Sequence, residues 1–190
     1  MKIFYYPLIV FGVLTLSILY SSNCVFAEDS TAEMKVSEGD ILEPFMLPIY
    51  GQRGKYGALR DYCGEPRPTR PNEPRRLVVL SFFASYCVPC KKEIPELERL
   101  AGEWGNEVSV LLISVGNKIK DIDKWKLQNK TNLPIFMDPY KATSVERYGV
   151  STIPTLVILD KKGVIQYIHR GYKPGDEIEA DKVVRKLLAE

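Results

Sequence analysis

Apolar runs and amphipathic stretches alternate along most of the chain. The segment 77–83 is almost wholly apolar and has the length of a strand, as does the segment 108–115. Such runs are typical of strands that are buried on both faces. The stretch 87–104 between them carries apolar residues at helical spacing, at positions 90, 94, 97, 101 and 104. These patterns predict a strand, a helix and a second strand.

The remainder of the chain continues the alternation. It predicts a helix at 119–129, an extended piece at 133–137, a short helix at 143–148, strands at 155–159 and 164–169, and an amphipathic helix around 180–188. The order β-α-β-α-β-β-α indicates a central mixed sheet with helices on both faces. Before it, the segment 41–62 has short apolar pieces broken by glycines, which predicts a β-hairpin or two short strands. The segment 65–76 carries four prolines and several charges, and we expect an exposed loop.

The N-terminus has the features of a targeting segment. Lys2 precedes an apolar run over 3–19, and Val25-Phe26-Ala27 resembles a cleavage site. We therefore predict a signal peptide at 1–27, a flexible lead-in at 28–39 and one domain at 40–190. An uncleaved membrane anchor and lipidation of Cys24 are the alternatives. All three place the domain outside the cytoplasm, either in a periplasm or tethered to the membrane by this segment alone.

Composition narrows the function classes. The chain has 190 residues, of which 45% are hydrophobic and 26% charged, as expected for a globular protein with a core. The formal net charge is +2, which gives no reason to expect a nucleic-acid partner.

The cysteines supply candidate chemistry. If Cys24 leaves with the signal, three remain, and an odd number argues against a purely structural disulfide framework. Cys87 lies where the first buried strand leads into its helix, whose free N–H groups favour the thiolate. Cys90 follows one turn later, within reach of a disulfide. This spacing predicts two-step exchange, in which Cys87 attacks a disulfide and Cys90 resolves the mixed disulfide.

Two other uses of the cysteines stay open. Cys63 and His169 could join the pair in a Cys₃His zinc site, although a second Cys-x-x-Cys is missing. Cys63 could instead be a buried free thiol, or it could pair with another chain.

The segment 77–95 resembles the active-site region of the thioredoxin superfamily, and it is most similar to the extracytoplasmic oxidoreductases of the TlpA/ResA type. The similarity continues through Ile113-Ser114-Val115-Gly116, Tyr148-Gly149-Val150, Ile153-Pro154-Thr155 and Asp160-Lys161-Lys162-Gly163, and covers about residues 40–190. It implies an α/β thioredoxin-like fold with an N-terminal hairpin extension.

The resemblance also implies roles for individual residues. Pro154 is expected to follow a cis peptide bond and to pack against the cysteines, while the backbone of Ile153 pairs with an extended substrate; an ordinary trans proline is the alternative. Glu93 is expected to accept a proton from Cys90, and its alternative is a surface glutamate that stabilises the helix start.

Two departures from thioredoxins bear on these roles. Ser81 stands where thioredoxins carry a buried aspartate, which strengthens the case for Glu93. Tyr86 stands where they carry a tryptophan. It would offer an aromatic face beside the sulfurs, or else serve as a half-exposed packing residue.

The expected function is thiol–disulfide oxidoreduction on protein substrates, in the reducing direction. The family implies a role in cytochrome c maturation and a membrane electron donor of the DsbD/CcdA kind. We expect no metal and no organic cofactor, because the cysteines carry the electrons. A disulfide oxidase or isomerase is the nearest alternative. A peroxidase would have Thr or Ser in place of Ala84, and a copper chaperone would have one more residue between the cysteines.

Overall fold

Strand β3 (Leu77–Phe83) lies in the middle of a five-stranded sheet in the computed structural model, which describes residues 34–69, 71–72 and 74–190. The strand order is β5-β4-β3-β6-β7. β3 runs parallel to β4 (Val108–Val115), which runs parallel to β5 (Ile135–Asp138). On its other side β3 pairs antiparallel with β6 (Thr155–Leu159), and β6 pairs antiparallel with β7 (Ile165–Arg170). Every residue of β3, β4 and β6 is buried, which accounts for their continuous apolar runs.

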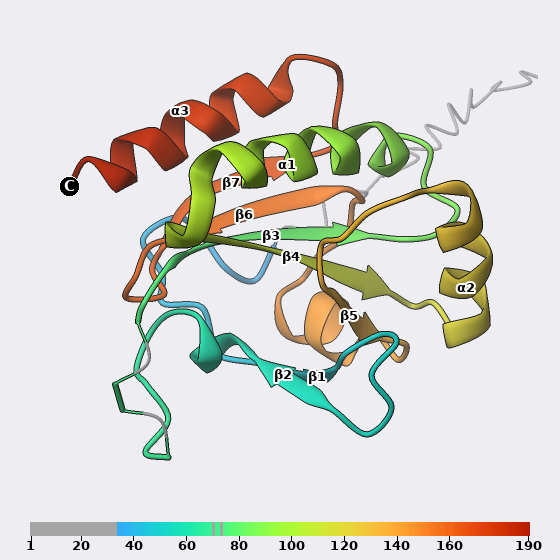
Figure 1. Ribbon diagram of the computed structural model, residues 1–190, viewed down its shortest axis with the longest axis horizontal. Coiled ribbons are helices and arrows are strands. Elements are labelled where there is room, and N and C mark those ends of the chain that lie inside the picture. The colour runs from blue at the N-terminus through green and yellow to red at the C-terminus, as the bar shows by residue number, and fades with distance from the viewer. Residues whose placement is uncertain (1–33, 70, 73) are drawn as a thin grey trace, which may run out of the picture. The chain divides into compact units, whose positions relative to one another are not determined.

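The three α-helices pack against one face of this sheet. They are α1 (Cys90–Trp104), α2 (Ile119–Gln128) and α3 (Asp176–Leu188). Apolar residues of α1 and α3 share a cluster with Leu77 and Val79 of β3, and those of α2 share one with Phe83 of the same strand. Since alternate residues of a strand point to the same face, all three helices cover the same side. Figure 1 shows α1 and α3 side by side over the sheet.

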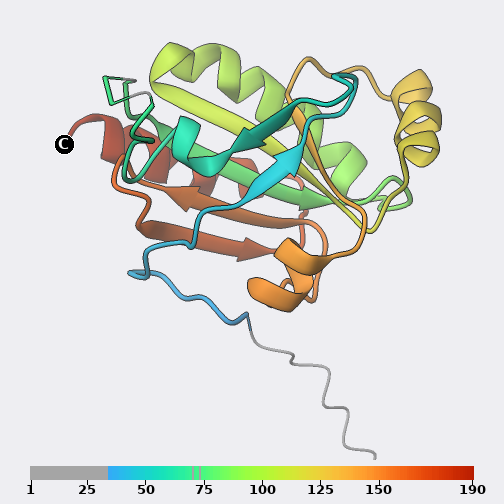
Figure 2. The ribbon, with the colours of Figure 1, turned by 90° about the horizontal axis from the view of Figure 1, so that it is seen from below.

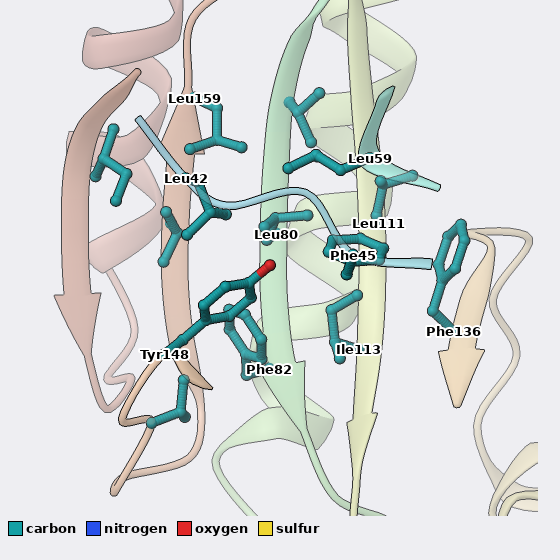
Figure 3. Close-up of a cluster of buried hydrophobic side chains, with 14 of the residues drawn as sticks. Leu42, Phe45, Leu59, Leu80, Phe82, Leu111, Ile113, Phe136, Tyr148 and Leu159 are labelled. Atoms are coloured by element: carbon teal, nitrogen blue, oxygen red, sulfur yellow. The ribbon is translucent and has the colours of Figure 1, made fainter. Parts of the chain in front are cut away.

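The opposite face is covered mainly by extended and irregular chain. Strands β1 (Met46–Pro48) and β2 (Tyr56–Ala58) form an antiparallel hairpin that lies over the sheet (Figure 2). The short helical turns are η1 (Leu59–Asp61), η2 (Gly105–Glu107) and the π-helical η3 (Ala142–Arg147). Figure 3 shows the core that results, with side chains from the N-terminal segment, β3, β4, β5 and β6.

The sequence predictions stand as follows. The thioredoxin-like α/β fold and the N-terminal hairpin are confirmed. The expectation of helices on both faces holds only through short helical turns such as η1, because α1, α2 and α3 all contact one face. The helix expected over 87–104 begins at Cys90, with Pro89 as its N-cap, so Cys87 lies in the preceding turn.

The targeting segment predicted at 1–27, with its anchor and lipidation alternatives, lies outside the described residues, as does the lead-in up to residue 33. The rest of the expected lead-in contacts the domain: Met34 is buried, and the Lys35 N–H donates to the Tyr148 carbonyl at 3.0 Å. Among the described residues, no helix has the length and apolar character needed to cross a membrane.

Candidate active site

Cys87 and Cys90 form a disulfide at the start of α1. The backbone N–H of Cys90 donates to Cys87 Sγ at 3.2 Å. Cys87 is 6% exposed and Cys90 is fully buried, so Cys87 is the sulfur that lies nearer to solvent. A helix N-terminus and a donated N–H both stabilise negative charge on a sulfur. The environment therefore favours Cys87 as the attacking thiolate.

The residues on either side of Cys87 project into solvent. Tyr86 is 71% exposed, and Val88 is 64% exposed. The alternative of a half-exposed packing residue is thus wrong, because most of the Tyr86 side chain is exposed. An exposed aromatic ring directly before the reactive sulfur leaves a surface that a polypeptide can contact.

Ile153 and Pro154 lie at the same end of the sheet as the cysteines. Thr155, the first residue of β6, pairs antiparallel with Phe82 near the end of β3, and the loop to Cys87 leaves from that end. The Ile153–Pro154 peptide bond is cis, as the resemblance implied. Pro154 is buried, and its carbonyl accepts the Gly171 N–H at 2.7 Å. Ile153 is half-buried and packs against the apolar cluster that contains both cysteines.

Glu93 is buried one turn after Cys90 and is 3% exposed. The Ser81 hydroxyl donates to its Oε2 at 2.6 Å. Burial raises the pKa of Glu93 to about 7, against the opposing effect of the Ser81 hydrogen bond, and the charge of Asp176 adds to the rise. The alternative of a surface glutamate is therefore wrong. This carboxyl can take up or release a proton close to neutral pH.

Two polar partners of the site were missed by the sequence reasoning. Ser81 was noted only as a departure, yet a serine inside a buried strand requires a hydrogen-bond partner, and Glu93 supplies it. Asn117 follows β4 and joins its end to the loop before Cys87. Its side chain accepts the Ser85 N–H and donates to the Ser85 hydroxyl, each at 3.0 Å. A polar residue two positions after the end of a buried strand was the available signal.

The structure does not assemble the Cys₃His set considered above. Cys63 is a free, buried thiol in the core cluster on the opposite face of the sheet from the Cys87–Cys90 pair. Burial and the charge of Asp160 raise the pKa of Cys63 to about 12. His169 Nε2 instead lies 3.0 Å from Asp176 Oδ2. Within the described part of the chain, no three His, Cys, Asp or Glu side chains are grouped so that they could hold a metal ion.

The sequence matches a known protein family and curated relatives that carry out thiol–disulfide chemistry. Residues 59–168, more than half of the chain, match the family model described as the AhpC/TSA family. The chain belongs to the AhpC/TSA family. Among curated relatives, the thioredoxin-like protein YneN of Bacillus subtilis is 28% identical over 172 residues, which cover 88% of this chain and 92% of YneN. The thiol-disulfide oxidoreductase ResA of Halalkalibacterium halodurans is 26% identical over 122 residues, covering 64% of this chain and 68% of ResA.

Solved structures show the same architecture. A putative thiol:disulfide interchange protein DsbE from Chlorobium tepidum is similar with a TM-score of 0.69 and 24% identity, covering 80% of this chain and 99% of that one. The pneumococcal exposed lipoprotein thioredoxin Etrx1 from Streptococcus pneumoniae has a TM-score of 0.57 and 29% identity, over 74% of this chain and 98% of Etrx1. This AhpC/TSA protein is a thiol–disulfide oxidoreductase of the ResA/DsbE type, and Cys87 and Cys90 are its Cys-x-x-Cys pair.

Proposed function

We propose that the protein acts outside the cytoplasm as a reductant of protein disulfides, with substrates that belong to cytochrome c maturation. A membrane protein of the DsbD/CcdA kind would return electrons to the Cys87–Cys90 disulfide. The extracytoplasmic location is supported by the similarity to the exposed pneumococcal lipoprotein and by the targeting segment expected at the N-terminus.

The buried carboxyl of Glu93 is the observation that carries the reducing direction. A dithiol pair becomes a strong oxidant when its reduced form is stabilised, as in DsbA. A carboxylate one helical turn from Cys90 opposes a second negative charge on the sulfurs and raises the thiol pKa. Less stabilisation of the thiolate raises the free energy of the reduced pair, so the Cys87–Cys90 disulfide forms more readily and the dithiol is a better reductant.

Cys87 and Cys90 would divide the reaction into two steps. The Cys87 thiolate attacks one sulfur of the substrate disulfide, and the other substrate sulfur leaves as a thiolate that takes up a proton. Cys90 then gives its proton to Glu93 and attacks Cys87 Sγ. This second attack releases the remaining substrate thiol and leaves the Cys87–Cys90 disulfide seen in the structure.

Ile153 and Tyr86 would hold the substrate, and Pro154 would shape the docking groove. The backbone of Ile153, just before Pro154, lies at the cysteine end of the sheet and would pair with an extended substrate segment. The exposed ring of Tyr86 would contact the apolar residues beside the substrate disulfide.

The reduction potential tests the direction. The pair, equilibrated in dithiothreitol redox buffers, should show a potential closer to that of thioredoxin, about −270 mV, than to that of DsbA, about −120 mV. A value near that of DsbA would replace the proposed reductase with an oxidase.

A further inference from the structure

A buried proton acceptor needs a way to exchange its proton with solvent. Glu93 is almost fully enclosed, and Ser81, its hydrogen-bond partner, is itself fully buried in β3. If Glu93 takes a proton from Cys90 in each turnover, as proposed above, the buried carboxyl has to exchange that proton with solvent to become a carboxylate again while the disulfide persists. The serine hydroxyl offers no route, because the strand on which it lies is covered on both faces.

A small cavity opens on the other side of Glu93, between α1, β6, β7 and α3. It has a volume of about 10 Å³ and is lined by Glu93, Leu97, Leu156, His169, Tyr172, Asp176, Glu177 and Ala180. About 10–15 Å³ is the space that one water molecule requires. The cavity therefore joins Glu93 to the single histidine of the chain.

His169 is held in a defined orientation at this cavity. Its Nε2 lies 3.0 Å from Asp176 Oδ2, which also accepts the Lys173 N–H at 2.8 Å. Burial tends to raise the pKa of Asp176, but these two hydrogen bonds outweigh it and lower the pKa. Asp176 thus remains a carboxylate, which can accept from Nε2–H and leaves Nδ1 as the ring nitrogen outside this pair. The His169 side chain is 31% exposed, so the ring also reaches solvent.

The other ionisable groups at the cavity are occupied with each other. The Tyr172 hydroxyl donates to Glu177 Oε2 at 2.8 Å, and burial together with this bond raises the pKa of Tyr172. On α1, Glu96 accepts from Arg99 at 3.0 Å and so is paired along its own helix. Of the described residues that line the cavity, only His169 combines contact with solvent and a ring that can both accept and donate a proton.

We propose that His169, oriented by Asp176, relays the proton of Glu93 to solvent through the water-sized cavity. The Glu93 carboxyl gives its proton to a water molecule in the cavity, and that water gives one of its protons to His169 Nδ1. The imidazolium then loses a proton to bulk water, which restores the neutral ring and the Glu93 carboxylate. No electrons move in these steps. His169 acts through Glu93 and does not touch the sulfurs. This relay rests on the proton-accepting role proposed for Glu93.

The test follows repeated turnovers of the full-length protein with a peptide disulfide at saturating concentration and an excess of a dithiol that reduces the Cys87–Cys90 disulfide, between pH 5 and 9. His169→Gln keeps an N–H donor for Asp176 but cannot relay a proton. We expect its rate to fall about tenfold near pH 7, which is less than the roughly 100-fold or larger effect of a direct general acid or base, because His169 does not touch the reacting atoms. His169→Ala should slow equally, and added imidazole should restore its rate. Glu179→Gln is the matched control, because Glu179 lies on α3, is exposed, and does not line the cavity.

Two results would overturn the relay. Either both His169 variants react at the rate of the unaltered protein at every pH, or both are slow and imidazole restores neither, which indicates a purely structural role. The variant Glu93→Gln shows whether only the relay is wrong or whether the proposed role of Glu93 is wrong as well. If Glu93→Gln is slow while the His169 variants are normal, only the relay is wrong. If Glu93→Gln itself reacts normally, the role of Glu93 is wrong and the relay falls with it.

Discussion

The ionisation of Glu93 makes the stability of the disulfide form depend on pH, and Glu93→Gln isolates that effect. The pKa of Glu93 is about 7 in the fold and 4.5 for an unperturbed glutamate. Between these values the unfolded chain has lost the proton and the folded protein retains it, so stability falls as pH rises. Each pKa unit is worth about 1.4 kcal/mol, so the full loss is about 3 kcal/mol, and most of it falls between pH 5 and pH 8.

Glutamine has the shape of the protonated glutamate and does not titrate. Urea unfolding at pH 5 and pH 8 gives the free energy of unfolding of the oxidised protein at each pH. The decrease in this free energy from pH 5 to pH 8 is then compared between the unaltered protein and Glu93→Gln. We expect this decrease to be about 2–3 kcal/mol smaller in Glu93→Gln than in the unaltered protein. Any change in unfolding free energy that the substitution causes equally at both pH values cancels when the two decreases are compared. Glu179→Gln, which changes an exposed carboxyl on α3, should lose as much as the unaltered protein.

Equal losses for the unaltered protein and Glu93→Gln would refute the reasoning. Glu93 would then ionise in the fold as it does in water, and burial beside Ser81 would not control its charge.

Three further predictions follow from packing and burial. Gly57→Ala should destabilise the protein by about 1–3 kcal/mol, because its Cβ would lie 2.4 Å from Cε1 of the buried Phe136 ring. Gly102 is exposed in α1, and Gly102→Ala would place a Cβ with no neighbouring atom within 4 Å, so this substitution should stabilise the protein by about 0.5–1 kcal/mol. Urea unfolding compares the free energies of unfolding of the two variants. Cys63 should resist iodoacetamide at pH 8 in the native protein and react fully in urea, as read by peptide mass mapping, since its thiol is buried with a pKa of about 12; alkylation of the native form would contradict this. Ser81→Ala should move the midpoint of the pH-dependent stability change upward, because the hydrogen bond that lowers the pKa of Glu93 is lost, and an unmoved midpoint would show that the bond is unimportant.

Much of the sheet could be predicted from the sequence, and the reason is burial. β3, β4 and β6 were predicted with the residue bounds they have, because a strand buried on both faces is an uninterrupted apolar run with sharp ends. The amphipathic pattern of a helix shows which of its sides is buried but not which face of the sheet it covers. That is why the placement of α1, α2 and α3 on one face was not predicted.

Some residues of the candidate site could also be predicted from the sequence, and others could not. The cysteine pair and Pro154 lie in short motifs that identify them without knowledge of tertiary contacts. The Ser81–Glu93 hydrogen bond depends on how α1 sits on β3, twelve residues away in the chain, and the His169–Asp176 pair depends on how α3 begins beside β7. No local pattern carries such information, so both contacts had to come from the structure.

The central claim is that Cys87 attacks and Cys90 resolves. It rests on the burial of the two sulfurs and on the N–H that Cys90 donates to Cys87 Sγ. The most direct measurement is to express the full-length chain as Cys90→Ser and as Cys87→Ser and to isolate the proteins that each variant holds in mixed disulfides. With the resolving thiol removed, Cys90→Ser should accumulate mixed disulfides through Cys87, and Cys87→Ser should not. If both variants hold the same partners in equal amounts, or if only Cys87→Ser holds them, the assigned roles are contradicted.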